Sequence, residues 1–109
     1  FTIERHEDLA RTAAARLKDL DYSNVQVRHG DGTLGWPEAA PFDSIVVAAG
    51  GAEVPQALKE QLKPGGRLVM PVGDSKIQSL LIVTRLDEDS FDVQKGIDVR
   101  FVPLIASKA

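Results

Sequence analysis

Residues 43–50 read DSIVVAAG, and this stretch decides the fold class of the chain. Its centre, residues 44–49, is a continuous run of small and apolar side chains bounded by Asp43 and Gly50. A run of this kind is typical of a strand that is covered on both faces, as the strands of a parallel sheet are. We therefore expect residues 44–49 to form an inner strand of an α/β sheet.

Helices and strands alternate on both sides of this run. Downstream, a helix is expected from about Pro55 to Leu62, because proline is tolerated in the first turn of a helix. The stretch KPGGRLVMPVG, residues 63–73, then turns at its Pro-Gly-Gly and begins a strand at residue 67. Regular alternation of strand and helix is the pattern of an α/β fold with a mostly parallel sheet.

The upstream part of the chain repeats the pattern. Residues 1–3 are β-prone, and Val25 and Val27 begin a second strand that ends at Gly30. Between these strands, apolar residues recur every three or four positions, which predicts an amphipathic helix over residues 7–20. The residues of this apolar stripe are Leu9, Ala10, Ala13, Leu17 and Leu20.

After residue 73 no further helix is expected. The stretches QSLLIVTRL (78–86) and FDVQKGIDVRFVPLI (91–105) are strand-like with no helix between them, so we expect them to pair antiparallel at one edge. The acidic run 87–89 fits the tip of their hairpin. The whole order is β-α-β-β-α-β-β-β, an open, mostly parallel α/β sheet with an antiparallel C-terminal edge.

Composition and charge exclude several classes of function. The chain has 43% hydrophobic and 27% charged residues, which suits one soluble globular domain. Its net charge of −3 is spread over mixed acids and bases, so we expect no nucleic-acid partner. No apolar run approaches the roughly 20 residues of a membrane-spanning helix, so we expect no membrane partner. The absence of cysteine excludes disulfides and thiolate metal sites and fits a cytoplasmic protein.

The stretch HGDGTLGWPEAAPFD, residues 29–43, contains glycines at the G-x-G-x-x-G spacing of a dinucleotide-binding fingerprint. Such a fingerprint needs a helix directly after its glycines, because the helix N-terminus binds the pyrophosphate. Only eight residues, WPEAAPFD, separate Gly35 from the next strand, and two of them are prolines. This segment is too short for a crossover helix, so we reject the fingerprint interpretation.

Two acidic residues follow the first two strands and are candidates for a nucleoside site. Asp31 comes just after the strand that ends at Gly30, and Glu4 ends the strand at the start of the chain. In open α/β sheets, ligands bind beyond the carboxyl ends of the strands, where a carboxylate can accept hydrogen bonds from ribose hydroxyls. Plainer interpretations stay open for both residues. Asp31 could bond the backbone of its own turn, and Glu4 could be an acid favoured at the start of a helix.

Four stretches together resemble the protein-L-isoaspartate O-methyltransferase family. They are FTIER (1–5), NVQVRHGDGTLGWPEAAPFDSIVVAAGG (24–51), LKPGGRLVMPVG (62–73) and VRFVPL (99–104), in the family's order and spacing. The parts GDGTLGWPEAAPFD and RFVPL are specific to that family, whereas LKPGGRLV resembles many S-adenosylmethionine-dependent methyltransferases. The resemblance runs through essentially all 109 residues and implies a Rossmann-like class I methyltransferase sheet.

The resemblance also implies a reaction, protein repair. The family transfers a methyl group from S-adenosylmethionine to the carboxylate of L-isoaspartyl residues in damaged proteins, and the ester then collapses to a succinimide that partly reopens as aspartate. No metal is needed for this transfer, and no catalytic side chain is implied within the chain. The implied cofactor-binding residues are Glu4 at the ribose hydroxyls, and Asp31 and Gly32 beside the adenine. The implied substrate-binding residues are Ala49, Gly50 and Pro55 in the methyl-transfer cleft, and Arg100, Phe101, Val102 and Pro103 along the substrate peptide.

The chain departs from the family pattern at its start. The family's glycine-rich loop, which holds the methionine part of the cofactor, precedes everything present here, as do the serine and threonine residues at the substrate carboxylate. We interpret residues 1–109 as the C-terminal part of a methyltransferase domain without its first βα unit. The family's sheet places the absent strand between the strands at residues 1–3 and 44–49. Two unpaired inner edges then remain, through which the chain could self-associate, and we expect little or no activity from the chain alone.

Two other functions stay open. A non-catalytic interaction module would keep the sheet and lose the chemistry, and a glycine-rich loop in the upstream sequence would argue against it. Another small-molecule methyltransferase would share the sheet, because a fold does not fix the methyl acceptor. The stretch RFVPL disfavours that alternative. Trp36 beside Pro37 is interpreted as a loop cover over the edge of the core, with packing beside the adenine as the alternative.

Overall fold

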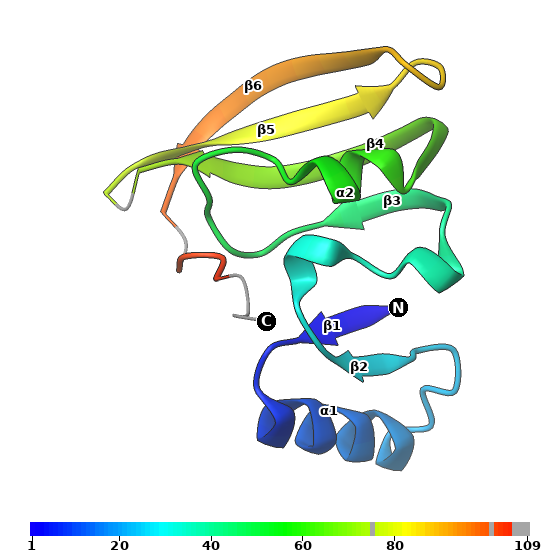
Figure 1. The fold of residues 1–109 in the computed structure, drawn as a ribbon. Helices are drawn as coiled ribbons and strands as arrows, with labels where there is room; N and C mark the ends of the chain where they lie inside the picture. Colours follow the sequence, from blue (N-terminus) through cyan, green and yellow to red (C-terminus); the bar gives the residue numbers. More distant parts are fainter. Residues whose placement is uncertain (75, 101, 106–109) are drawn as a thin grey trace.

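The computed structural model describes residues 1–74, 76–100 and 102–105 of the chain (Figure 1). Strands and helices occur in the order that the sequence predicts, and no α-helix lies between the glycines of residues 30–35 and the next strand. In chain order the elements are β1 (Thr2–Glu4), α1 (Glu7–Asp19), β2 (Val27–His29), the short 3₁₀ helices η1 (Gly32–Leu34) and η2 (Pro37–Ala39), β3 (Phe42–Val46), α2 (Gln56–Glu60), β4 (Leu62–Gly73), β5 (Gln78–Arg85) and β6 (Phe91–Val99).

The strands form two separate sheets. β1 and β2 pair in parallel, with Ile3 opposite Arg28. The second sheet has the order β3-β4-β5-β6, in which β3 and β4 are parallel and the other neighbours are antiparallel. The predicted α/β class with an antiparallel C-terminal edge is therefore confirmed. The division falls between β1 and β3, which is where the family resemblance places an absent strand (Figure 1).

The core lies between α2 and one face of the four-stranded sheet. Side chains alternate between the two faces along a strand, and in β4 this brings the completely buried Leu68 and Met70 to the same face. Leu68 lies opposite Val83 of β5, which is also buried. Leu58 of α2 and Leu62 at the start of β4 complete the cluster. The predicted strand at residue 67 is thus the central part of a longer strand that the core holds in place.

β3 contradicts the prediction of a strand covered on both faces. Ile45 and Val47 pack against the core, whereas Val46 between them is 76% exposed. β3 ends the order of its sheet, and α2 covers only one face of it (Figure 1). The apolar composition of β3 shows that both of its faces suit burial. Which face is actually covered depends on the other segments of the chain that pack against it.

α1 lies against the small sheet of β1 and β2 (Figure 1). The helix is confirmed, but of its predicted apolar stripe only Ala10 is buried, while Leu9 and Leu20 are more than half exposed. Two short strands are too narrow to cover a stripe that runs along the whole helix.

Candidate functional site

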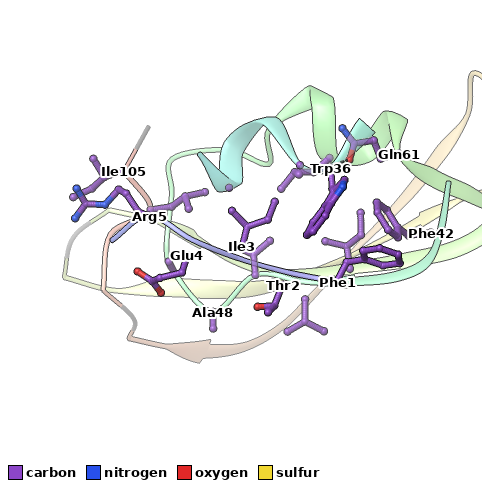
Figure 2. Close-up of a pocket in the computed structure, with 18 of the residues that line it drawn as sticks. Phe1, Thr2, Ile3, Glu4, Arg5, Trp36, Phe42, Ala48, Gln61 and Ile105 are labelled. Carbon is purple, nitrogen blue, oxygen red and sulfur yellow. Dashed lines mark hydrogen bonds between the residues drawn. The ribbon is translucent and has the colours of Figure 1, made fainter. Parts of the chain in front are cut away.

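An open cavity of about 480 Å³ lies between β1 and β3 (Figure 2). β1 and the residues on either side of it form one wall, and residues 44–49 form the other. Figure 2 shows the rings of Phe1, Trp36 and Phe42 close together at one end, with Glu4 at the other. The cavity therefore has an aromatic end and a carboxylate end.

The two walls present strand edges to each other. Thr2 N donates to Gln26 O (2.9 Å), and Gly30 N donates to Glu4 O (3.0 Å), so Thr2 and Glu4 bond toward β2. Successive residues of a strand paired in parallel turn their backbone groups to opposite sides, so those of Ile3 point away from β2, toward the cavity.

The edge of β3 is arranged in the same way. Val47 N donates to Val69 O (2.9 Å), which places the backbone groups of Val46 on the side away from β4. β1 and β3 also run in the same direction (Figure 1). The cavity is thus bounded by two open edges of like direction.

Glu4 lies at the carboxyl end of β1 and lines the cavity. One of its oxygens, Oε1, accepts a hydrogen bond from the backbone N–H of His6 (3.1 Å), just before α1 begins. The plainer interpretation of Glu4, an acid at a helix start, therefore has a structural counterpart. Among the described residues, the second oxygen has no hydrogen-bond partner, so the same carboxylate also keeps an acceptor for a ligand.

Asp31 caps the short helix η1. Its Oδ1 accepts hydrogen bonds from the backbone N–H of Thr33 (2.9 Å) and from the Thr33 hydroxyl (2.6 Å). This is the turn that the plainer interpretation of Asp31 expected. Asp31 does not line the cavity, but Gly32 beside it does, and a Cβ placed on Gly32 would meet no atom within 4 Å. The turn thus presents a surface without a side chain at the cavity.

The C-terminal residues return to the sheet at Gly50. Gly50 N donates to Val102 O (2.7 Å), and Leu104 N donates to Gly50 O (2.6 Å), which forms a parallel bridge between Gly50 and Pro103. Two segments that the sequence analysis assigned to the substrate therefore lie side by side.

The cavity brings together five of the predicted site residues and leaves four outside. Those in its lining are Glu4, Gly32, Ala49, Val102 and Pro103. Asp31, Gly50, Pro55 and Arg100 do not line it, although Asp31 and Gly50 adjoin residues that do. Phe101 lies outside the described residues.

Gln61, which no sequence pattern indicated, also lines the cavity. Its side chain is buried and hydrogen-bonded to the loop of η1. A single glutamine before LKPGG carries no sequence signal of its own. The nearest indication of its role is Gly35, which takes a positive φ and lies beside the Gln61 amide.

Trp36 covers the aromatic end of the cavity. Its ring packs edge-on against Phe1, with ring centroids 5.1 Å apart, and the Arg28 guanidinium lies 5.1 Å from its centroid. Arg28 also pairs with Glu38 at 3.0 Å, and this hydrogen bond lowers the pKa of Glu38. These contacts agree with the interpretation of Trp36 as a loop cover.

Within the part of the chain that the structure describes, no three His, Cys, Asp or Glu residues are grouped so that they could hold a metal ion. The helices of that part include none with the length and apolarity needed to cross a membrane.

Comparison with known proteins gives a consistent result. The model of the protein-L-isoaspartate(D-aspartate) O-methyltransferase family matches residues 1–109. Protein-L-isoaspartate O-methyltransferase of Brucella anthropi is 54% identical over 110 residues, which cover all of this chain and 51% of that protein. The enzyme of the same name from Pelotomaculum thermopropionicum is 55% identical over 99% of this chain and 47% of its own length. The chain thus spans about half the length of the curated relatives it matches.

Solved structures agree in fold. A protein-L-isoaspartate O-methyltransferase superposes with a TM-score of 0.85 at 30% identity, over 93% of this chain and 32% of that one. A Plasmodium falciparum structure, described as a protein of this type in complex with S-adenosyl-L-homocysteine, gives a TM-score of 0.80. It is 24% identical and is matched over 94% of this chain and 50% of its own, so it supports the fold alone.

Proposed function

Because the chain belongs to the protein-L-isoaspartate(D-aspartate) O-methyltransferase family, we propose that it supplies the nucleoside side of a methyl-transfer site. The reaction is transfer of a methyl group from S-adenosylmethionine to the carboxylate of an L-isoaspartyl residue. Residues 1–109 act as the C-terminal part of the methyltransferase domain that carries it out.

The observation that carries this proposal is the meeting of two strand ends at the cavity. The hydrogen bond from Gly30 N to Glu4 O joins the carboxyl ends of β1 and β2, so the turn at Asp31 and Gly32 follows directly beside Glu4. Ligands of open α/β sheets bind at this end of the strands. The free oxygen of the Glu4 carboxylate suits the hydroxyls of a ribose. Gly32, which has no side chain, suits the close approach of a flat base.

The residues present fit the nucleoside of S-adenosylmethionine. Glu4 can accept hydrogen bonds from two adjacent hydroxyls, because a carboxylate has about four acceptor positions and one hydrogen bond is already made. The open space beside Gly32 leaves room for the adenine face. The Asp31 carboxylate holds in shape the turn from which Gly32 would face the base.

On the substrate side, the paired segments at Gly50 and Pro103 would bind the peptide. Bound S-adenosylmethionine supplies a sulfonium methyl group that an isoaspartyl oxygen can attack in line, so the new C–O bond forms as the S–C bond breaks. The chain's own residues then hold the two partners in line and exclude water, since the attacking carboxylate is already ionised. We assign this role to Ala49, Gly50, Pro55, Arg100, Val102 and Pro103, and by the resemblance also to Phe101.

The expected partners follow from this role. They are proteins and peptides with isoaspartyl residues, and we place the chain in the cytoplasm, which its lack of cysteine fits. The open edges of β1 and β3 also favour self-association of the chain.

Titration calorimetry with S-adenosylhomocysteine tests the cofactor side. We expect the unaltered chain to bind, and Glu4→Gln or Gly32→Val to weaken binding by about tenfold or more, equivalent to about 1.4 kcal/mol. Gly32→Val fills the open space without a backbone penalty, because Gly32 is not at positive φ. Glu7→Gln, which removes the same charge from the exposed first turn of α1, should bind as the unaltered chain does.

A labelling experiment tests the substrate. The chain, in excess, receives labelled S-adenosylmethionine and either of two peptides that differ in one L-isoaspartyl linkage. Label in the isoaspartyl peptide alone supports the proposal. If neither peptide is labelled but S-adenosylhomocysteine still binds, the role of the chain is limited to binding the cofactor. Equal labelling of both peptides, or no binding of S-adenosylhomocysteine, contradicts it.

A further inference from the structure

Gln61 is a buried polar side chain whose amide is held by a single loop. It is 8% exposed, and both ends of its amide are hydrogen-bonded. Nε2 donates to the carbonyl of Leu34 (2.9 Å), and Oε1 accepts from the backbone N–H of Trp36 (2.9 Å). The two partners belong to the loop before β3 and are distant from Gln61 in sequence, so these are tertiary contacts. Figure 2 shows Gln61 beside Trp36 at one end of the cavity.

The loop is shaped to receive this amide. Gly35 lies between the two bonded residues and has a φ of 65°, a conformation that glycine adopts without strain. A Cβ on Gly35 would overlap the Gln61 amide. The backbone from Leu34 to Trp36 and the side chain of Gln61 therefore fit only with glycine between them.

Gln61 is itself fixed by the core. It follows α2, where its N–H donates to Leu58 O (3.2 Å), and its own carbonyl accepts from Phe42 N (2.7 Å) at the start of β3. Leu58 is buried in the main cluster. The loop is thus tied through one side chain to the buried core of the molecule.

The same loop carries Gly32, which faces the cavity, and Asp31. We propose that Gln61 is a positioning residue that holds the loop 31–36 in the conformation that accepts the adenine nucleoside. The proposal rests on the proposed function for the identity of the ligand. Glutamine suits this role because it offers a donor and an acceptor side by side, whereas glutamate lacks the donor at neutral pH, and methionine has no donor and only a weak sulfur acceptor.

The experiment compares Gln61→Met, which keeps the length of the side chain, with the unaltered chain. Gln56→Met is the matched control, because Gln56 is exposed in the first turn of α2, the helix that Gln61 follows. The first measurement is hydrogen exchange at the Trp36 amide, which reports the loop whether or not a ligand binds. The second is the affinity for S-adenosylhomocysteine, followed by calorimetry and by the fluorescence of Trp36, the single tryptophan of the chain.

We expect Gln61→Met to exchange the Trp36 amide at least about tenfold faster and to bind S-adenosylhomocysteine about tenfold more weakly, while Gln56→Met changes neither. Unchanged exchange at Trp36, or faster exchange with unchanged affinity, overturns the proposal. If the unaltered chain binds no S-adenosylhomocysteine, the proposed function fails. Exchange of the Trp36 amide in Gln61→Met then decides by itself whether Gln61 holds the loop: faster exchange means that it does, and unchanged exchange means that it does not.

A second variant covers the case in which Gln61→Met does not fold. Gly35→Ala leaves Gln61 intact but drives a methyl group into its amide, so it should also speed exchange at Trp36 and weaken nucleoside binding. Because both changes act on one contact, their effects on affinity in the double variant should be less than additive. Full additivity would mean that the two residues act separately, and would contradict the proposal.

Discussion

Arg85 joins two parts of the chain that no other described side chain connects in this way. Its Nη1 donates to the carbonyls of Glu60 (2.9 Å) and Leu62 (2.8 Å), which end α2 and begin β4. Its Nε donates to Asp87 O (3.0 Å) and Nη2 to Glu88 O (2.7 Å) in the turn between β5 and β6. The planar fork of the guanidinium makes four bonds at once, which the single ammonium of lysine cannot reproduce.

Arg85→Lys should therefore lower the free energy of unfolding by about 1–3 kcal/mol although it keeps the charge, because it leaves several of these carbonyls without a donor. Urea unfolding followed by Trp36 fluorescence measures the change. Arg67→Lys, at an exposed position of β4, is the control, and should stay within about 0.5 kcal/mol. Equal stability of Arg85→Lys and the unaltered chain would show that the charge, and not the fork, matters.

Single residues differ in how far the sequence reveals their roles. The place of Glu4 could be predicted, because a strand and a helix meet at it and strand ends are where ligands bind. Gln61 could not, because its partners Leu34 and Trp36 become neighbours only when the loop folds back against α2. Asp31 shows an intermediate case: its bond to Thr33 is local and matches the plainer of the two interpretations left open by the sequence, whereas its position outside the cavity lining depends on how the loop packs.

The turn between β5 and β6 is an element with a definite pH dependence. Asp87 Oδ1 accepts hydrogen bonds from the backbone N–H groups of Asp89 (2.9 Å) and Ser90 (2.8 Å). The bond from Asp89 is the main reason that the pKa of Asp87 lies below its ordinary value of 3.8. Since the folded pKa is the lower one, the stabilisation is complete above 3.8 and is lost as the pH falls through the folded value.

Unfolding in urea at about pH 5.5 and about pH 2.5 should thus show a loss of stability on acidification that is smaller in Asp87→Asn than in the unaltered chain. Some loss should remain in the variant, because backbone hydrogen bonds from Ile77 and Lys76 also lower the pKa of Asp74. Glu88→Gln removes a charge from the same turn and is the control. The same acid loss in Asp87→Asn as in the unaltered chain would contradict the assignment.

Elements could be predicted better than their surroundings. The run at residues 44–49 did indicate a strand, and the hairpin at residues 78–99 was correctly placed, because side-chain alternation and turn residues are local signals. The start of β4 at Leu62 was not foreseen, since the glycines of KPGG disfavour a strand and pairing with β3 sustains it there. The exposure of Val46 was not foreseen either, because it is set by what lies across the cavity.

In the molecule as a whole, the most consequential feature is a sheet that is open in its middle. β1 and β3 face each other across the cavity with unpaired edges, and a further open edge runs along β6 (Figure 1). Unpaired edges recruit other strands unless charges or other devices protect them. The β6 edge is protected by charged side chains at Asp92, Lys95 and Asp98, whereas residues 44–49 of the inner edge carry no charge.

We therefore expect the chain to self-associate, and to do so through the inner edge in preference to β6. Val46→Lys places a charge on that edge at a position that is 76% exposed, so it should raise the monomer fraction without a cost to the core. Ile97→Lys makes the same change on β6, where the side chain is 71% exposed, and should have a smaller effect. Sedimentation velocity over a wide range of concentration measures both. A monomer at all concentrations would show that the inner edge is closed in solution. A larger effect of Ile97→Lys would show that the chain associates through β6 instead.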